Sequence, residues 1–251
     1  MAIIKTEAFV FKSFRFGETS LICRLLTRDR GVVPVIAKGA RRPKSRLGAA
    51  LGPFRRLGVT YYDKPGREIQ TLVDVELLVD HPGVAGSLER LEAAGAWFRF
   101  LRALLPEGAP ADTLYALATT ALMRLETSSE SDVGRWEAYH RAAVAGMLGL
   151  GPAIDACAGC GRELPDGGRL AFSVEEGGVL CGACAAHRPG SETLAPAAYA
   201  ILQLYHHSDY SLVAALEDDP GVEREVRRLI RRFVAYHADL GSSAADVRGA
   251  R

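Results

Sequence analysis

The first 80 positions consist of short runs typical of β-strands: residues 3–11 are apolar and β-branched, 19–27 alternate between apolar and polar, and 31–37 are rich in valine. Turn-forming residues separate the runs at 16–18, 28–31 and 63–66. Five strands in so short a segment predict a small closed barrel, with the OB-fold as leading candidate and an SH3-like barrel as the alternative. The predicted strands are 3–11, 19–27, 31–37, 57–62 and 69–79.

After residue 80 the apolar spacing changes to that of helices. His81, Pro82 and Gly83 interrupt the last predicted strand, and the polar stretch 127–132 is predicted to be a linker. Glycines at 149 and 151 end the third helix of the series. The predicted helices are 84–105, 113–126, 133–148, 196–207, 211–217 and 221–238.

These elements predict an α+β multidomain protein, in which an N-terminal OB-fold β-barrel precedes an α-helical domain carrying a four-cysteine zinc-ribbon insertion. The predicted parts are a DNA-binding barrel at 1–80, the first part of the helical domain at 81–152, the zinc module at 153–190, the second part of the helical domain at 191–240 and a flexible C-terminal tail at 241–251.

Composition narrows the class of protein. Hydrophobic residues make up 48% and charged residues 24% of the chain, the balance of a globular rather than a disordered protein. No apolar run approaches the roughly 18 residues that a membrane-spanning helix needs. Lys5 and Glu7 would interrupt a secretion signal. We therefore expect a cytoplasmic protein without a membrane partner.

Charge is unevenly distributed along the chain. Residues 1–80 carry 15 Lys and Arg against 8 Asp and Glu, a net charge of +7, whereas the remainder carries 16 against 22, a net charge of −6. All five lysines lie in the first 80 residues. This asymmetry indicates a polyanion-binding domain attached to an acidic body.

The positive charge is concentrated in residues 30–56, where eight basic residues occur without a single acidic one. Gly39, Pro43 and Gly48 indicate a loop rather than a helix, and phosphates are the natural partners of such a loop. Ser45 could add a hydroxyl contact. The alternative is a mobile basic loop without a dedicated ligand. The candidate DNA-binding residues are Lys38, Arg41, Arg42, Lys44, Arg46, Arg55 and Arg56.

Aromatic residues that could stack on bases are few near this loop, so we expect binding dominated by the phosphate backbone rather than sequence-specific recognition. About half of these aromatic residues should fill the barrel. They are Phe14, Phe16, Phe54, Tyr61 and Tyr62.

Four of the five cysteines form two C-x2-C pairs separated by twenty residues: Cys157 with Cys160, and Cys181 with Cys184. Four thiolates would complete a tetrahedral zinc site and leave no position for water, so the spacing predicts one structural Zn2+. The alternatives are a redox or disulfide role and a coincidental grouping. Cys23 is predicted to be an ordinary packed cysteine.

Other features of the chain point away from catalysis. No phosphate-binding loop of the G-x4-G-K-[ST] type is present, and no acidic cluster suits a two-metal nuclease. His206 and His207 adjoin at a predicted helix end, and because neighbouring positions do not share a helical face we do not expect a metal site there. The sequence thus predicts neither an enzyme nor a small-molecule substrate.

Helix 221–238 combines an apolar stripe with a row of arginines. One interpretation is a peripheral helix whose arginines face solvent. The other is a second anion-binding site for a protein partner, for which Arg227, Arg228 and Arg231 are the candidates.

The segment RFGETS at 15–20, the segment AKGARRPKSR at 37–46 and the LGPF sequence at 51–54 resemble the N-terminal signature of the RecO family, and the order of predicted elements is similar over essentially the whole chain. The complete set of four cysteines is similar to the zinc-carrying branch of that family. The resemblance implies a nucleoid-associated mediator of DNA repair and recombination that binds single- and double-stranded DNA and anneals complementary strands.

The same resemblance implies the protein partners. RecO proteins act with RecR in the RecF pathway to help RecA load onto DNA coated by single-strand binding protein (SSB), and they recognise the acidic C-terminal tail of SSB. An RNA-binding OB-fold module with a structural zinc is the alternative function, and a preference assay between DNA and RNA would separate the two. A zinc-dependent nucleic-acid enzyme is a third possibility, which four cysteine ligands disfavour.

Overall fold

The computed structural model describes residues 1–105, 112–165, 167–207, 210–217 and 219–238. The chain divides into two compact units, Met1–Ser128 and Ser129–Arg251. The division falls in the polar stretch predicted as a linker, and therefore inside the segment 81–152. The C-terminal tail predicted at 241–251 lies outside the described residues.

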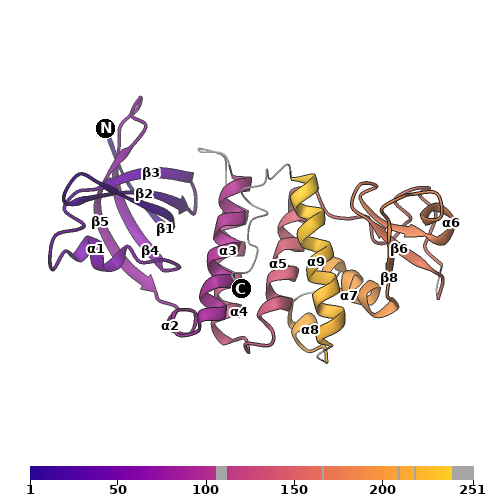
Figure 1. The fold of residues 1–251 in the computed structure, drawn as a ribbon. Helices are drawn as coiled ribbons and strands as arrows, with labels where there is room; N and C mark the ends of the chain where they lie inside the picture. The colour runs from indigo at the N-terminus through magenta and orange to yellow at the C-terminus, as the bar shows by residue number, and fades with distance from the viewer. Residues whose placement is uncertain (106–111, 166, 208–209, 218, 239–251) are drawn as a thin grey trace. The chain divides into compact units, whose positions relative to one another are not determined.

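The first unit begins with five strands that close into a barrel in the order β1-β2-β3-β5-β4 (Figure 1). β1 pairs antiparallel with both β2 and β4, while β3 pairs parallel with β5. This connectivity is that of the OB-fold, so the predicted fold is confirmed. The strands are β1 (Ala2–Phe16), β2 (Ser20–Thr27), β3 (Gly31–Ala37), β4 (Arg56–Asp63) and β5 (Gln70–Val79).

Both faces of β1 are buried at its centre. Ala8 and Val10 point into the barrel core, whereas the rings of Phe9 and Phe11 lie 5.7 and 5.6 Å from that of Phe98. Phe98 belongs to helix α3 (Leu88–Leu104). An apolar run replaces strict alternation here because a helix covers the outer face of the strand.

Three helices follow the barrel among the described residues of the first unit: α2 (Pro82–Ala85), α3 and α4 (Asp112–Thr127). The helix predicted at 84–105 is broken because Ser87 caps the start of α3, its hydroxyl accepting a bond from the Arg90 backbone N–H. Glu126 accepts bonds from the backbone N–H groups of Gly83 and Val84, at 2.7 and 3.1 Å. These contacts join the end of α4 to the first turn of α2.

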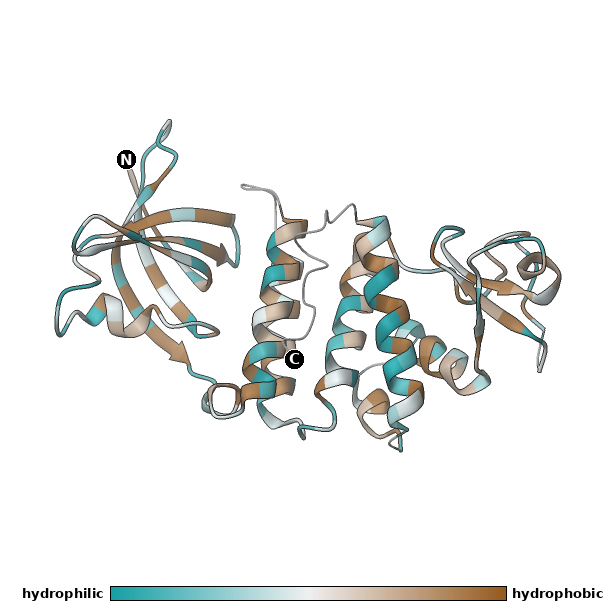
Figure 2. Ribbon diagram, in the orientation of Figure 1, coloured by the Kyte–Doolittle hydropathy of each residue, from teal (hydrophilic) through white to brown (hydrophobic). Residues whose placement is uncertain are grey.

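The second unit combines helices with a small three-stranded sheet in the order β7-β6-β8. Helix α9 packs its apolar stripe, which includes Val226, Leu229 and Phe233, into the unit, and Figure 2 shows its alternating apolar and polar faces. The elements are α5 (Val133–Met147), β6 (Leu170–Ser173), β7 (Gly178–Cys181), α6 (Gly182–Ala185), β8 (Glu192–Leu194), α7 (Pro196–His207), α8 (Tyr210–Ala214) and α9 (Pro220–His237). Among the described residues, no helix is both long and apolar enough to cross a membrane.

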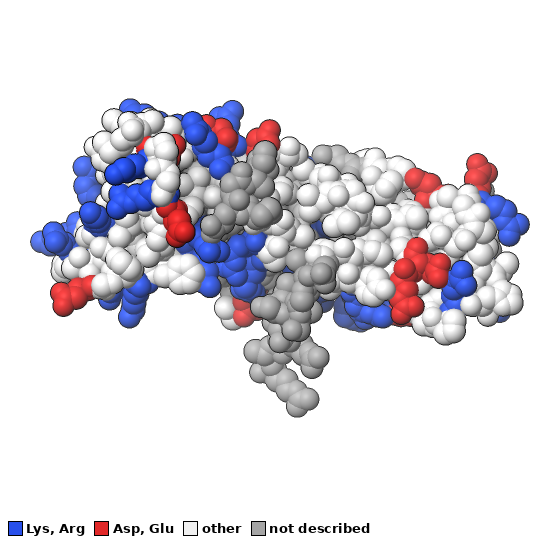
Figure 3. Space-filling view, turned by 90° about the horizontal axis from the view of Figure 1, so that it is seen from above, with Lys and Arg blue, Asp and Glu red and all other residues white. Residues whose placement is uncertain are grey.

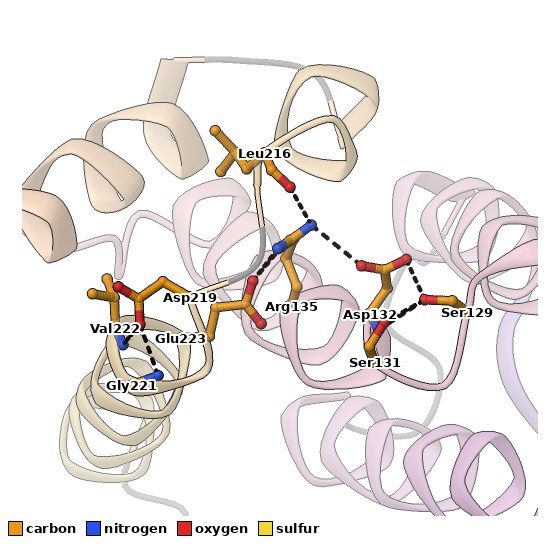
Figure 4. Close-up of polar contacts among 9 residues, drawn as sticks. All are labelled: Ser129, Ser131, Asp132, Arg135, Leu216, Asp219, Gly221, Val222 and Glu223. Atoms are coloured by element: carbon orange, nitrogen blue, oxygen red, sulfur yellow. Dashed lines mark hydrogen bonds and ion pairs between the residues drawn. The ribbon is translucent and has the colours of Figure 1, made fainter.

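A buried arginine joins the helices of the second unit (Figure 4). Arg135 of α5 is 2% exposed, and its guanidinium donates to Glu223 of α9, to Asp132 and to the carbonyl of Leu216. Its Nε lies 2.7 Å from Glu223 Oε1. A buried cation is tolerated only when such partners replace water.

Replacing Glu223 by Gln should lower the free energy of unfolding of the second unit by about 2 kcal/mol, because the buried guanidinium loses its closest counter-charge. Trp136, the only tryptophan of this unit, reports its unfolding in urea when Trp97 is replaced by Phe. Glu175→Gln, at an exposed position, is the control and should change the free energy by less than about 0.5 kcal/mol. Equal stability of the two variants would contradict a structural role for the pair.

Candidate nucleic-acid interface and metal centre

The basic loop, residues 38–46, leaves the barrel after β3 as a series of tight turns. The Arg42 N–H donates to the Gly39 carbonyl at 3.0 Å, and the Ser45 N–H donates to the Arg42 carbonyl at 3.1 Å. Gly39 and Lys44 have φ angles of 71° and 61°, in the left-handed region that such turns require. The backbone of the loop is therefore held by its own hydrogen bonds.

Part of the segment predicted as a loop is helical, since α1 spans Arg46–Ala50. The Ser45 hydroxyl accepts a bond from the Gly48 N–H at 3.2 Å, so it caps α1, a role different from the phosphate contact considered from the sequence. A Cβ built at Gly48 would lie 1.9 Å from the Ala40 carbonyl oxygen. Only glycine allows α1 to approach the loop so closely.

Apolar residues anchor this segment in the barrel. Ala40 and Leu51 are 5% and 7% exposed and belong to the barrel core, against which Leu47 packs. The charged side chains between these anchors point outward. Five of the seven predicted DNA-binding residues are exposed: Lys38, Arg41, Arg42, Lys44 and Arg46. Basic side chains outnumber acidic ones on the visible face of the barrel (Figure 3).

Arg41 also has a structural contact, because its guanidinium donates to the carbonyls of Gly17 and Glu18 at 3.2 and 3.0 Å. The Arg41 N–H donates to the Thr19 carbonyl at 2.8 Å. The turn between β1 and β2 thus holds the middle of the basic loop against the barrel.

The other two predicted residues already have acidic partners within the first unit. Arg55 forms a two-pronged pair with Asp80, at 3.1 and 3.2 Å, and this pair lowers the pKa of the Asp80 carboxyl. Arg56 lies 3.8 Å from Glu7. Both arginines are half-buried, so among the seven predicted DNA-binding residues the exposed positive charge is that of the five in the basic loop.

A groove of about 780 Å³ lies on the barrel and is lined by residues of all five strands, among them Phe14 and Arg24, and by Arg30 of the turn between β2 and β3. The Phe14 ring is exposed, and the Lys12 ammonium lies 4.5 Å from its centroid. Phe16 is also exposed, whereas Tyr61 lies in the barrel core. The groove is a candidate surface that the sequence did not indicate, because strands distant in sequence form it.

The four paired cysteines come together in the second unit, with all four Sγ atoms within 4.8 Å of one another. Four thiolates around Zn2+ would be about 3.8 Å apart, given zinc–sulfur bonds of about 2.3 Å, so the cluster fits the ion. A Cβ at Gly159 would lie 3.3 Å from Cys184 Sγ, which shows how closely the backbone wraps the sulfurs. The fifth cysteine, Cys23, is packed in the barrel core, where burial raises its pKa to about 11.

Hydrogen bonds at the cluster favour the thiolate form of Cys157 and Cys160 and the protonated form of Cys184. Burial raises the pKa of Cys157, but the backbone N–H groups of Cys181, Cys160 and Gly159 outweigh it, so the pKa is lowered. The pKa of Cys160 is lowered to about 6, chiefly by the side chain and backbone N–H of Arg162. Hydrogen bonding with Cys160, Cys181 and Cys157 raises the pKa of Cys184 to about 12. A divalent cation would replace the shared protons and allow all four sulfurs to ionise.

The segment that carries the four cysteines is packed onto the helices of its own unit. The predicted hairpin forms as β6 and β7, and β8, which the sequence analysis missed, adds a third strand beside β6. Phe172 of β6 stacks edge-on against Phe233 of α9, with ring centroids 5.9 Å apart. The cluster therefore supports a sheet that covers one side of α9.

Two of the three predicted partner-binding arginines are ion-paired inside the second unit. Arg231 donates to the carboxylate of Glu137, a residue that is only 4% exposed. The same carboxylate pairs with Arg141 at 3.0 Å. Burial alone would raise the pKa of Glu137, but the two arginines lower it. Arg228 and Arg232 both pair with Glu192 of β8. The guanidinium of Arg227 lies beside Gly134 of α5.

Comparison with known proteins identifies the family. The family description "Recombination protein O N terminal" matches residues 1–79, and "Recombination protein O C terminal" matches residues 85–243. The chain belongs to the RecO family.

Curated relatives agree over nearly the full length of the chain. A protein named DNA repair protein RecO from Rubrobacter xylanophilus is 34% identical over 249 residues, which cover 99% of this chain and 98% of the relative. Proteins of the same name from Anaeromyxobacter sp. and Salinibacter ruber are 34% and 33% identical, covering 93% and 95% of this chain and 91% and 89% of the relatives. The resemblance stated from the sequence is thereby confirmed.

Protein purified without chelator should contain one zinc per chain, and Cys160→Ser or Cys184→Ser should abolish zinc binding and lower the melting temperature of the second unit. The metal is expected to supply on the order of 10 kcal/mol of local ordering, which serine ligands cannot retain. Elemental analysis measures the zinc content, and the fluorescence of Trp136 measures the melting temperature of the second unit. Cys23→Ala is the control, since it removes a thiol outside the cluster and should leave the zinc content at one. Metal well below one per chain in folded wild-type protein would refute the site.

Proposed function

We propose that the protein is a mediator of DNA repair and recombination that binds single- and double-stranded DNA through the basic loop and anneals complementary strands. The observation that carries this proposal is the outward row of five cations on an ordered, acid-free loop of an OB-fold barrel. Membership of the RecO family supports the same role. No covalent step is required of the protein, which would work in the cytoplasm at the nucleoid.

Phosphate binding follows from the chemistry of the loop. Arginine offers forked donors and lysine a point charge, and both exchange condensed counterions for direct contact with the backbone of DNA. A fixed loop backbone reduces the entropy lost on binding. Because such contacts do not identify bases, affinity should vary little with sequence.

Annealing requires two polyanions at short range. A positive surface lowers their mutual repulsion by displacing counterions, so that base pairing can complete the reaction. The barrel groove with exposed Phe14 could hold one strand by stacking while the basic loop binds the other. We propose that this activity extends to SSB-coated strands and that, with RecR, the protein assists RecA loading.

Replacing Lys38, Arg42 and Arg46 by Ala should weaken binding to unrelated single strands about equally and slow annealing of SSB-coated complementary strands. If the wild-type protein neutralises about six phosphates, log K should fall with log salt at a slope of about −4, and at about −2 in the variant. Fluorescence anisotropy over a salt series and a strand-annealing assay make these measurements. Arg41 is retained because it also holds the loop.

The matched control removes three cations elsewhere on the barrel, at Lys5, Lys64 and Arg67, which are exposed. This variant loses the same net charge as the loop variant, and its slope of log K against log salt should stay close to that of the wild-type protein. If both triple variants lose affinity to the same extent, net charge rather than the basic loop governs binding. Preference for a matched RNA strand over DNA would instead favour the RNA-binding alternative.

We further propose that the arginine row of α9 binds the acidic tail of SSB. Arg227 and Arg228 are the residues to test, while Arg231 is excluded because it neutralises the buried Glu137. Glu192 competes for Arg228, since their side chains are 2.6 Å apart. An acidic peptide would have to replace this intramolecular partner.

Removing the arginines and removing the charge of Glu192 should have opposite effects on binding of the peptide. Arg227→Ala with Arg228→Ala should weaken binding of a fluorescent SSB-tail peptide by about 1–3 kcal/mol, because charge-assisted hydrogen bonds are lost. Glu192→Gln should strengthen binding, because it frees Arg228 and Arg232. Titration of the peptide by anisotropy measures both. Unchanged affinity in both variants, with the fold intact by circular dichroism, would assign these arginines to packing alone.

A further inference from the structure

A second group of metal-ligating side chains lies in the second unit, outside the four cysteines. Asp155 stands in the segment between α5 and Cys157, and His206 and His207 are the last two residues of α7. Their ligand atoms all lie within 4.8 Å of one another. The side chains are 59%, 42% and 52% exposed in that order, so an ion from solvent can reach them.

The helix end brings the two adjacent histidines together, contrary to the expectation from helical faces. Their rings meet edge to face with centroids 4.6 Å apart, and His206 Nδ1 lies 3.4 Å from His207 Nε2. Asp155 Oδ1 lies 2.6 Å from His207 Nε2, and Asp155 Oδ2 lies 3.9 Å from His206 Nδ1. Two imidazole nitrogens and a carboxylate thus converge on one point.

A hydrogen bond between His207 and Asp155 accounts for the shortest of these contacts and leaves His206 Nδ1 beside it. If His207 Nε2 carries the proton, it donates to Asp155, and an unprotonated His206 Nδ1 turns its lone pair toward the same hydrogen. If His207 Nε2 is instead unprotonated, its lone pair faces a lone pair of the Asp155 carboxylate oxygen. A metal cation in place of the proton would satisfy all three atoms at once.

The backbone that presents Asp155 is held independently of the histidines. The Tyr199 hydroxyl of α7 donates to the Ile154 carbonyl at 3.1 Å, and Gln203 Nε2 donates to that hydroxyl at 3.2 Å. Ile154 is 2% exposed. The three ligands are therefore held near one another before any ion binds, which lowers the entropic cost of binding.

We propose that Asp155, His206 and His207 form a second metal site, for a divalent transition-metal ion such as Zn2+, Ni2+ or Co2+. Imidazole nitrogen with carboxylate oxygen is the ligand set of these ions, whereas Mg2+ and Ca2+ prefer oxygen alone. Three protein ligands leave at least one coordination position for water or for a donor from a partner. A bound ion would tie the entry of the cysteine module to α7.

The test uses the full-length, zinc-loaded protein and Ni2+ as the probe. Isothermal titration calorimetry should show that one nickel ion binds per chain in addition to the cysteine-bound zinc. Elemental analysis follows the zinc content throughout. Asp155→Asn and His207→Ala should each weaken nickel binding at least about tenfold, since even the loss of an outer-shell partner costs that much. The control is His187→Ala, an exposed histidine three residues after Cys184, which should bind as the wild type does.

Each other result overturns the proposal. Equal nickel affinity in all four proteins would mean that no site exists, and loss in His207→Ala without loss in Asp155→Asn would leave a histidine pair instead of a three-ligand site. Asparagine keeps the size of aspartate at an exposed position, so Asp155→Asn should stay folded, as circular dichroism can check. Nickel should raise the melting temperature of the wild-type protein and not of Asp155→Asn. None of these readouts depends on DNA binding.

Discussion

The packing of helix α3 on the outer face of β1 is the constraint on which the first unit depends. Ala8 and Val10 fill the barrel while Phe9 and Phe11 pack beneath Phe98, so a slip of one residue would exchange the two sets, forcing the rings into the barrel core and leaving the smaller side chains against the helix. The fixed register of β1 determines where the turn to β2 lies. Because carbonyls of that turn hold Arg41, the position of the basic loop follows from the packing of a helix on the opposite side of the strand.

Much of the fold could be predicted from the sequence, because the strands and long helices carry clear periods of two and 3.6. Choosing an OB-fold over an SH3-like barrel needed the pairing of β1 with β4 and the parallel pairing of β3 with β5, which are long-range contacts. Strand β8 was missed because its three residues have no pattern and depend on β6 for pairing. Helix α1 was missed because tertiary packing and the Ser45 cap outweigh the low helix propensity of Gly48.

The cysteine cluster was predictable because each pair is local in sequence and the spacing is specific. For the arginines, the positions of the charges could be predicted, but the acidic residues that pair with them could not. Arg55 meets Asp80 and Arg231 meets Glu137 only after folding, across 25 and 94 positions. A run of like charges therefore overstates the charge available to a ligand, and the fold decides which members of the run are free to act.

Shape and charge are set by different residues in the basic loop. Ala40, Leu47 and Leu51 attach it to the barrel, and the contact between Gly48 and the Ala40 carbonyl fixes its path, while Arg41 and Arg55 are the cations that add hydrogen bonds to backbone carbonyls here. The polarity of the surface could then be redesigned, even inverted with acidic side chains, on an unchanged backbone. Natural variation should follow the same division, with free exchange among the outward positions and strict retention of glycine at position 48.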